Sequence, residues 1–287
     1  MLYPDFSELV QSIFVLSLSV LIFIFFVVLA VLNLKALKKY YKTGLFVGII
    51  VFLMTLPAAI FNLIYFDPSV ILKGRPEPFL KIYIYIGLIV GLGILILKIG
   101  WHMIVYYAAV SEWDKIRPEA FTVLKKSKNV PWKVILAAAI FGVVSGVVST
   151  VIFVALGMNE SEPLKRITLM FPHAAEAGLI IRIPVLLLFV TGAAVIEELV
   201  FRGGLQAFLL RLSGNKRPAV IGSIIFVSLL WAGLHIFNTD MPAIKSLQIF
   251  IIGIVFSEFT RRSCVESAMA GHIALNFTAV IMYFIMI

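Results

Sequence analysis

The chain contains long, almost uninterrupted apolar stretches, each close to the length that crosses a lipid bilayer. A helix needs about 20 apolar residues to span the hydrocarbon core. Inside lipid the backbone must satisfy its own polar groups, which favours helices for segments of this length. The sequence therefore predicts an all-α, polytopic transmembrane helix bundle of about eight spans. These lie near residues 13–34, 44–66, 82–108, 134–157, 178–201, 218–238, 243–260 and 264–286.

The composition agrees with a membrane protein. The chain is 62% hydrophobic and 14% charged, which is more apolar and less charged than an ordinary soluble domain. The first stretch is too long for the core of a signal peptide and no basic region precedes it, so we expect a retained span. A single cysteine, Cys264, excludes an intramolecular disulfide and a cysteine-based metal cluster. We expect a multi-pass protein of the cell membrane.

Basic residues are unevenly distributed between the connections. Those after the first, third, fifth and seventh stretches hold most of them, including Lys35, Lys38, Lys39, Lys42, Lys115, Arg117, Lys125, Lys126, Lys128, Lys133, Arg211, Lys216, Arg217, Arg261 and Arg262. The positive-inside rule places these connections in the cytoplasm and both termini outside it. The net charge of +9 is therefore explained by the connections between spans. We expect a lipid bilayer as partner and no nucleic acid.

Two adjacent carboxylates, Glu197 and Glu198, end the fifth stretch. A charge at the centre of a membrane helix costs roughly 2.5–3.5 kcal/mol, so such groups need partners or a function. Glu198 and Arg202 are four residues apart and can pair on one helical face. Glu197 is turned by about 100° from Glu198. We interpret Glu198–Arg202 as a structural ion pair and Glu197 as catalytic; the alternative is that Glu197 is a second structural carboxylate. An apolar stripe continues this helix to Leu212.

Polar side chains also occur in two later stretches. His235 ends the sixth, and His272 and Asn276 share one face of the eighth. Such groups should face the bundle interior or a wet cavity rather than lipid. With Glu197 they suit hydrolysis by an activated water: the carboxylate takes the proton, one imidazole orients the water, and the other donors meet the oxyanion. The alternatives are a packing role for His235 and an interhelical hydrogen bond for Asn276.

The order of these motifs resembles a known family. Glu-Glu-x-x-x-Arg-Gly, aromatic-x-x-x-His and His-x-x-x-Asn on successive apolar helices resemble the CPBP family of intramembrane glutamate-dependent proteases, which includes CAAX proteases and bacteriocin-processing (Abi) proteins. The resemblance covers roughly residues 175–287. It implies that Glu197 and His235 activate the water and that His272 and Asn276 bind the oxyanion. Trp231 stands where the family often has phenylalanine.

The resemblance divides the chain into two parts and suggests an activity. Residues 1–172 would be N-terminal transmembrane helices of unassigned role, and residues 173–287 a catalytic core. The implied function is an intramembrane endopeptidase acting on a peptide or lipidated protein, with the C-terminal tripeptide of a prenylated CAAX protein as one candidate substrate. The rival is a non-catalytic scaffold or bacteriocin-immunity protein of the same family. A transporter is disfavoured because the sequence shows no internal repeat.

We expect no metal cofactor. The sequence has no His-Glu-x-x-His motif and no His-x-x-x-His spacing. Two histidines and a carboxylate are a known zinc set, so zinc is the less favoured alternative.

The depths of the site residues do not agree if the helices are straight. At ~1.5 Å per residue, His272 lies about 12 Å from the cytoplasmic end of its helix, Glu197 about 22 Å and His235 about 26 Å. The predicted site therefore requires helices that tilt, break or begin later than drawn.

Overall fold

A computed structural model describes residues 6–64, 77–124, 129–157, 179–214, 216–236 and 241–286. The described residues form helices joined by short connections, which confirms the predicted all-α bundle. The predicted boundary between residues 172 and 173 lies outside them. The helices are α1 (Phe6–Leu32), α2 (Leu34–Ile64), α4 (Glu77–Asp114), the short 3-10 turn η1 (Pro118–Ala120), α5 (Trp132–Ala155), α7 (Leu179–Glu198), the π-helix η3 (Leu199–Gln206), α8 (Ala207–Leu212), α9 (Arg217–His235), α10 (Pro242–Arg262) and α11 (Val265–Met286).

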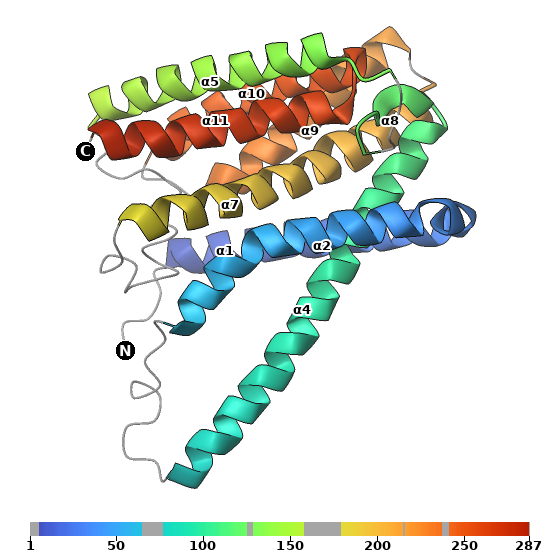
Figure 1. The fold of residues 1–287 in the computed structure, drawn as a ribbon. Coiled ribbons are helices and arrows are strands. Elements are labelled where there is room, and N and C mark those ends of the chain that lie inside the picture. The colour runs from blue at the N-terminus through green and yellow to red at the C-terminus, as the bar shows by residue number, and fades with distance from the viewer. Residues whose placement is uncertain are drawn as a thin grey trace.

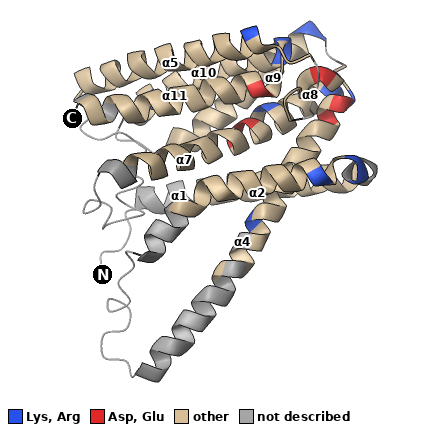
Figure 2. Cartoon of the chain, in the orientation of Figure 1, with Lys and Arg blue, Asp and Glu red and all other residues tan. Residues whose placement is uncertain are grey.

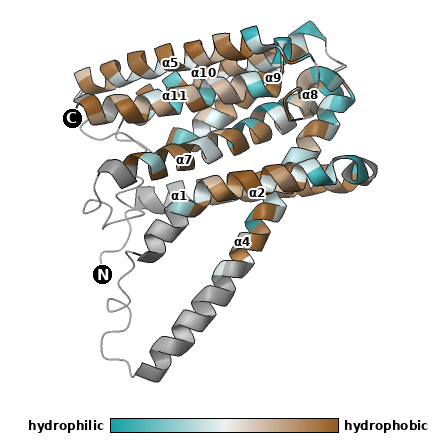
Figure 3. Cartoon of the chain, in the orientation of Figure 1, coloured by the Kyte–Doolittle hydropathy of each residue, from teal (hydrophilic) through white to brown (hydrophobic). Residues whose placement is uncertain are grey.

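Many of these helices are built to face lipid. Among the described residues, 6 segments are long and apolar enough to cross a membrane. Their outward faces carry large exposed apolar side chains such as Leu136, Ile140 and Leu229, and apolar residues cover much of the ribbon in Figure 3. The protein is therefore a multi-pass integral membrane protein. The segments are Lys38–Pro57, Trp132–Ala155, Ile183–Leu212, Arg217–His235, Pro242–Arg262 and Val265–Met282, with a shorter apolar helix at Leu16–Leu32.

The C-terminal helices pack side by side, and α4 crosses α2 beside them (Figure 1). The pair α5 and α11 is held at close range by glycines. A Cβ atom on Gly142 of α5 would collide with the carbonyl oxygen of Gly271 of α11. Small residues at such positions let helix backbones approach, which increases van der Waals contact where lipid supplies no hydrophobic driving force.

The fifth span continues to Leu212, as its apolar stripe predicted, but it passes through the π-helix η3. All residues of η3 except Leu205 are buried. A Cβ atom on Gly204 would collide with the ring of Phe26, and one on Gly203 would lie 2.8 Å from the Cβ of Ala109. The two glycines thus allow α1 and α4 to pack directly against η3.

One end of the bundle is strongly charged. Figure 2 shows lysine, arginine and acidic residues gathered around α8 and the neighbouring helix ends. Within this end, buried Glu112 of α4 pairs with Arg211 of α8 at 2.5 Å and with Lys115 at 2.7 Å. Under the positive-inside rule this end is predicted to face the cytoplasm.

Candidate functional site

Three side chains meet between α7 and α9. The carboxylate of Glu197 accepts a hydrogen bond from the indole N–H of Trp231, with Oε2 and Nε1 2.7 Å apart. The same oxygen lies 3.8 Å from Nε2 of His235, and the side chains of His235 and Glu197 are 16% and 28% exposed. The structure therefore brings together two residues whose predicted depths differed, and both are accessible.

The hydrogen bonds of His235 define its tautomer. Its Nδ1 lies 2.8 Å from the backbone carbonyl oxygen of Trp231. A carbonyl can only accept, so Nδ1 carries the proton. In the neutral imidazole the other nitrogen, Nε2, then presents a lone pair. Nε2 is the atom nearest Glu197, so the neutral ring presents a hydrogen-bond acceptor toward the carboxylate.

A second, buried polar cluster lies next to this pair, on the other side of Trp231 from His235. Oε1 of Glu198 lies 3.0 Å from Nη1 of Arg202 and 2.9 Å from Nδ1 of His272. The side chains of Glu198 and Arg202 have no exposed surface, and that of His272 is 5% exposed. The predicted contact between Glu198 and Arg202 is present in the structure. His272, which is predicted to share a helical face with Asn276, also binds Glu198.

Arg202 is held on several sides. Its Nη2 donates to the carbonyl oxygen of Gly253 at 3.2 Å, and its guanidinium lies 4.3 Å from the centroid of the Trp231 ring. Its own carbonyl oxygen, in η3, accepts a 3.0 Å bond from the indole N–H of Trp113. A π-helix shifts the ladder of backbone bonds. Here the indole of Trp113 on α4 bonds to the backbone of η3, and the backbone of α10 at Gly253 bonds to the side chain of Arg202.

The role of Trp231 was not predicted from the sequence, although Trp231 is part of the aromatic-x-x-x-His motif. It is 2% exposed, and its ring centroid lies 5.0 Å from that of His272 and 5.6 Å from that of His235. Trp231 therefore joins the Glu197 pair to the buried cluster. A signal existed, because a buried indole N–H needs an acceptor and a membrane helix interior offers few.

Asn276 lies further along α11. Its Nδ2 is 3.5 Å from the carbonyl oxygen of Val190 on α7, at the outer limit of a hydrogen bond. This contact joins α11 to α7 about two turns before Glu197. The structure therefore places Asn276 near the helix that carries Glu197, with its amide directed to the backbone.

Within the described ranges, no three histidine, cysteine, aspartate or glutamate side chains gather closely enough to hold a metal ion. Cys264 is buried, with its sulfur 3.2 Å from the hydroxyl of Ser267.

Comparison with known proteins finds a family match for the C-terminal part of the chain. No curated protein and no solved structure matches it. The family model of the type II CAAX prenyl endopeptidases, Rce1-like, matches residues 179–278. This range contains all six residues of the two polar groups predicted from the motifs. The match of residues 179–278 to the Rce1-like family of type II CAAX prenyl endopeptidases confirms the resemblance drawn from the sequence.

Proposed function

We propose that the protein is an intramembrane endopeptidase in which Glu197 and His235 activate a water molecule. The family match supports a CAAX-type intramembrane protease at the level of the family. The observation that carries the proposal is the 3.8 Å separation between Oε2 of Glu197 and Nε2 of His235. This gap is too long for a direct hydrogen bond, and one water oxygen fits within hydrogen-bond distance of both atoms.

The protonation states give that water an orientation. Glu197 accepts through its carboxylate, and His235 accepts through Nε2 because its Nδ1 donates to the carbonyl of Trp231. A water between them donates one hydrogen to each and turns its lone pairs away from both. In the proposed reaction Glu197 takes a proton as the water oxygen attacks the scissile carbonyl. The protonated carboxyl group then returns that proton to the leaving amine.

We assign the developing oxyanion to His272 and Asn276. Nδ1 of His272 already donates to Glu198, so only Nε2 can donate to the substrate. An oxyanion role therefore requires both ring nitrogens to be protonated. The negative charge of the oxyanion would balance the positive charge of the doubly protonated His272, because Glu198 and Arg202 already neutralise each other. Asn276 would have to turn its amide from Val190 towards the substrate.

The proposed substrate is a membrane-associated protein, with the C-terminal tripeptide of a prenylated CAAX protein as the specific candidate. A site carried on membrane helices suits a substrate that a lipid anchor holds at the bilayer. We further propose that the reaction needs no metal, with a zinc enzyme as the alternative, and that both termini lie outside the cytoplasm.

The rival is a non-catalytic scaffold of the same family. It is favoured by one observation, that Glu198 bonds to both Arg202 and His272 inside the bundle. Such a protein would keep the buried cluster for packing and would not need the partly exposed pair of Glu197 and His235.

The test is proteolysis by the purified full chain of prenylated and unmodified peptides ending in a CAAX sequence. Glu197→Gln preserves shape and removes the base, so cleavage should be lost while the melting temperature is unchanged. The matched control is Glu119→Gln, which alters a carboxylate that is 66% exposed and should cleave normally. Cleavage by a folded Glu197→Gln protein would refute the assignment, and an inactive wild type with both peptides would favour the scaffold.

A further inference from the structure

A basic pocket lies far from the candidate active site along α9. It is lined by residues of α9 and α10 around Arg217, the first residue of α9, whereas His235 is the last. At ~1.5 Å per residue the two are about 27 Å apart along the helix. The cavity measures about 460 Å³, within the range of about 300–1,000 Å³ of small-molecule sites.

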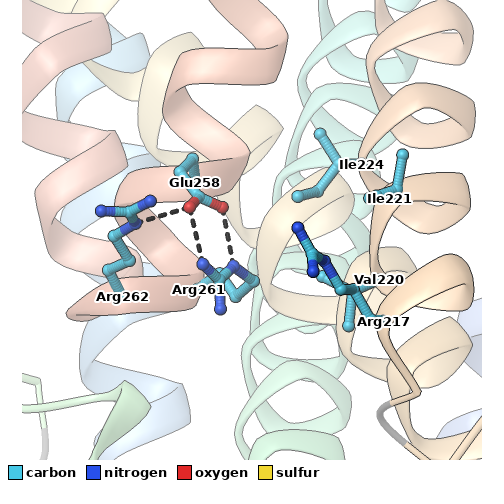
Figure 4. A pocket seen from close by; sticks show the side chains of 7 residues that line it. All are labelled: Arg217, Val220, Ile221, Ile224, Glu258, Arg261 and Arg262. Atoms are coloured by element: carbon cyan, nitrogen blue, oxygen red, sulfur yellow. Dashed lines mark hydrogen bonds and ion pairs between the residues drawn. The ribbon is translucent and has the colours of Figure 1, made fainter.

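Positive charge dominates the mouth of this pocket. Figure 4 shows Arg217 on the α9 side and Glu258, Arg261 and Arg262 on the α10 side. Glu258 accepts two bonds from Arg261, at 2.7 and 2.6 Å, and one from Arg262 at 2.5 Å. Three arginines and one carboxylate line the pocket, which leaves an excess of positive charge. Glu258 also fixes the two α10 guanidinium groups in place.

The wall below the arginines is apolar. Val220, Ile221 and Ile224 line it, three, four and seven residues after Arg217, so they share its helical face. Ile221 is 51% exposed in a segment long and apolar enough to cross the membrane. From Arg217 to Ile224 the lining of the pocket therefore changes from cationic to apolar over about 10 Å.

We propose that this pocket binds the phosphate of an anionic phospholipid headgroup, with an acyl chain lying along Ile221 and Ile224. Guanidinium groups match phosphate geometry through paired N–H donors. Basic pockets between membrane helices at the cytoplasmic surface suit anionic headgroups. A free phosphate ion would use the arginines but not the apolar wall, where Ile221 is exposed. The change from cationic to apolar surface is what an amphiphile standing in the bilayer matches.

The test measures lipid binding to the purified full chain by native mass spectrometry. The probes are phosphatidylglycerol, phosphatidylcholine with the same acyl chains, and inorganic phosphate. The variant is Arg217→Gln with Arg262→Gln, which leaves the two bonds of Arg261 to Glu258 intact and so should fold. The control, Lys133→Gln with Lys216→Gln, removes the same charge from exposed positions on the same end of the bundle that do not line the pocket.

We expect phosphatidylglycerol to be preferred over phosphatidylcholine, and inorganic phosphate to bind far more weakly than the lipid. Each arginine near the surface contributes roughly fivefold in affinity, so the double variant should lose about 25-fold and the control should lose little. Equal losses in the two double variants would show diffuse attraction and overturn the proposal. Binding of phosphatidylcholine as tight as that of phosphatidylglycerol would also overturn it. Inorganic phosphate binding as tightly as the lipid would show a free-anion site and would likewise overturn it.

Discussion

Replacing Arg202 by methionine tests whether the buried cluster holds the bundle together. Methionine roughly fills the volume of arginine but removes the guanidinium, which bonds to Glu198 at 3.0 Å and to the carbonyl of Gly253 at 3.2 Å. Both charged side chains have no exposed surface. Removing one partner of such a pair leaves a buried, uncompensated charge, at a cost of about 3–5 kcal/mol. We expect the free energy of unfolding to fall by that amount.

The assay is unfolding in mixed micelles by titration with a denaturing detergent. A second variant, Glu198→Gln with Arg202→Met, removes both charges and leaves an oxygen acceptor for His272. Replacing both ions of a buried pair is often nearly neutral, so the double variant should recover most of the lost stability. The control is Arg211→Met, because Arg211 is 33% exposed and its partner Glu112 keeps a second cation, Lys115. It should lose much less.

Two results would contradict this reasoning. Wild-type stability of the Arg202→Met protein would mean that Glu198 does not depend on its cation. A double variant as unstable as the single one would mean that the loss comes from Gly253 and Trp231 contacts and not from the charge on Glu198.

Three further predictions concern the reaction. Trp231→Phe keeps an aromatic ring but removes the donor to Glu197, so kcat should fall about tenfold or more, as for other bonds to charged groups; an unaltered kcat would show that the bond does not position the base. Asn276→Ala should lower kcat by ~10²–10³ at constant KM if the amide meets the oxyanion, whereas reduced stability alone would assign Asn276 to its contact with Val190. Cleavage should survive exhaustive chelation, and loss of activity that zinc restores would place the protein among the metalloproteases.

Local features of the fold could be predicted because they depend on neighbouring residues in the chain. Apolar stretches of bilayer length predicted the helices, and the spacing of Glu198 and Arg202 predicted their contact. The continuation to Leu212 was also correct, because an apolar stripe reports helix length. The π-helix was not foreseen, since nothing in residues 199–206 distinguishes π from α bonding by pattern alone.

Contacts between helices could not be read from spacing. Trp231 and Glu197 are 34 residues apart, and His272 and Glu198 are 74 apart. Their meeting depends on how α9 and α11 cross α7, which single-helix periodicity does not specify. For this reason the sequence placed His272 beside Asn276 on one face but could not show its bond to Glu198.

The bonds from the end of α4 to the C-terminal helices limit how this chain can be divided. The indole of Trp113 binds the backbone of η3. Arg117 donates to the carbonyl oxygens of Thr260 and Ser263 at 2.6 and 2.7 Å. These oxygens lie at the C-terminal end of α10, where the carbonyl groups of a helix have no N–H partner within the helix. All of these acceptors lie within the family-matched region, yet their donors lie outside it. A truncated gene encoding only that region would therefore yield a bundle in which these carbonyl oxygens lose their donors. An N-terminal half taken from a relative should support folding only if it supplies both donors, a tryptophan and an arginine at the positions of Trp113 and Arg117.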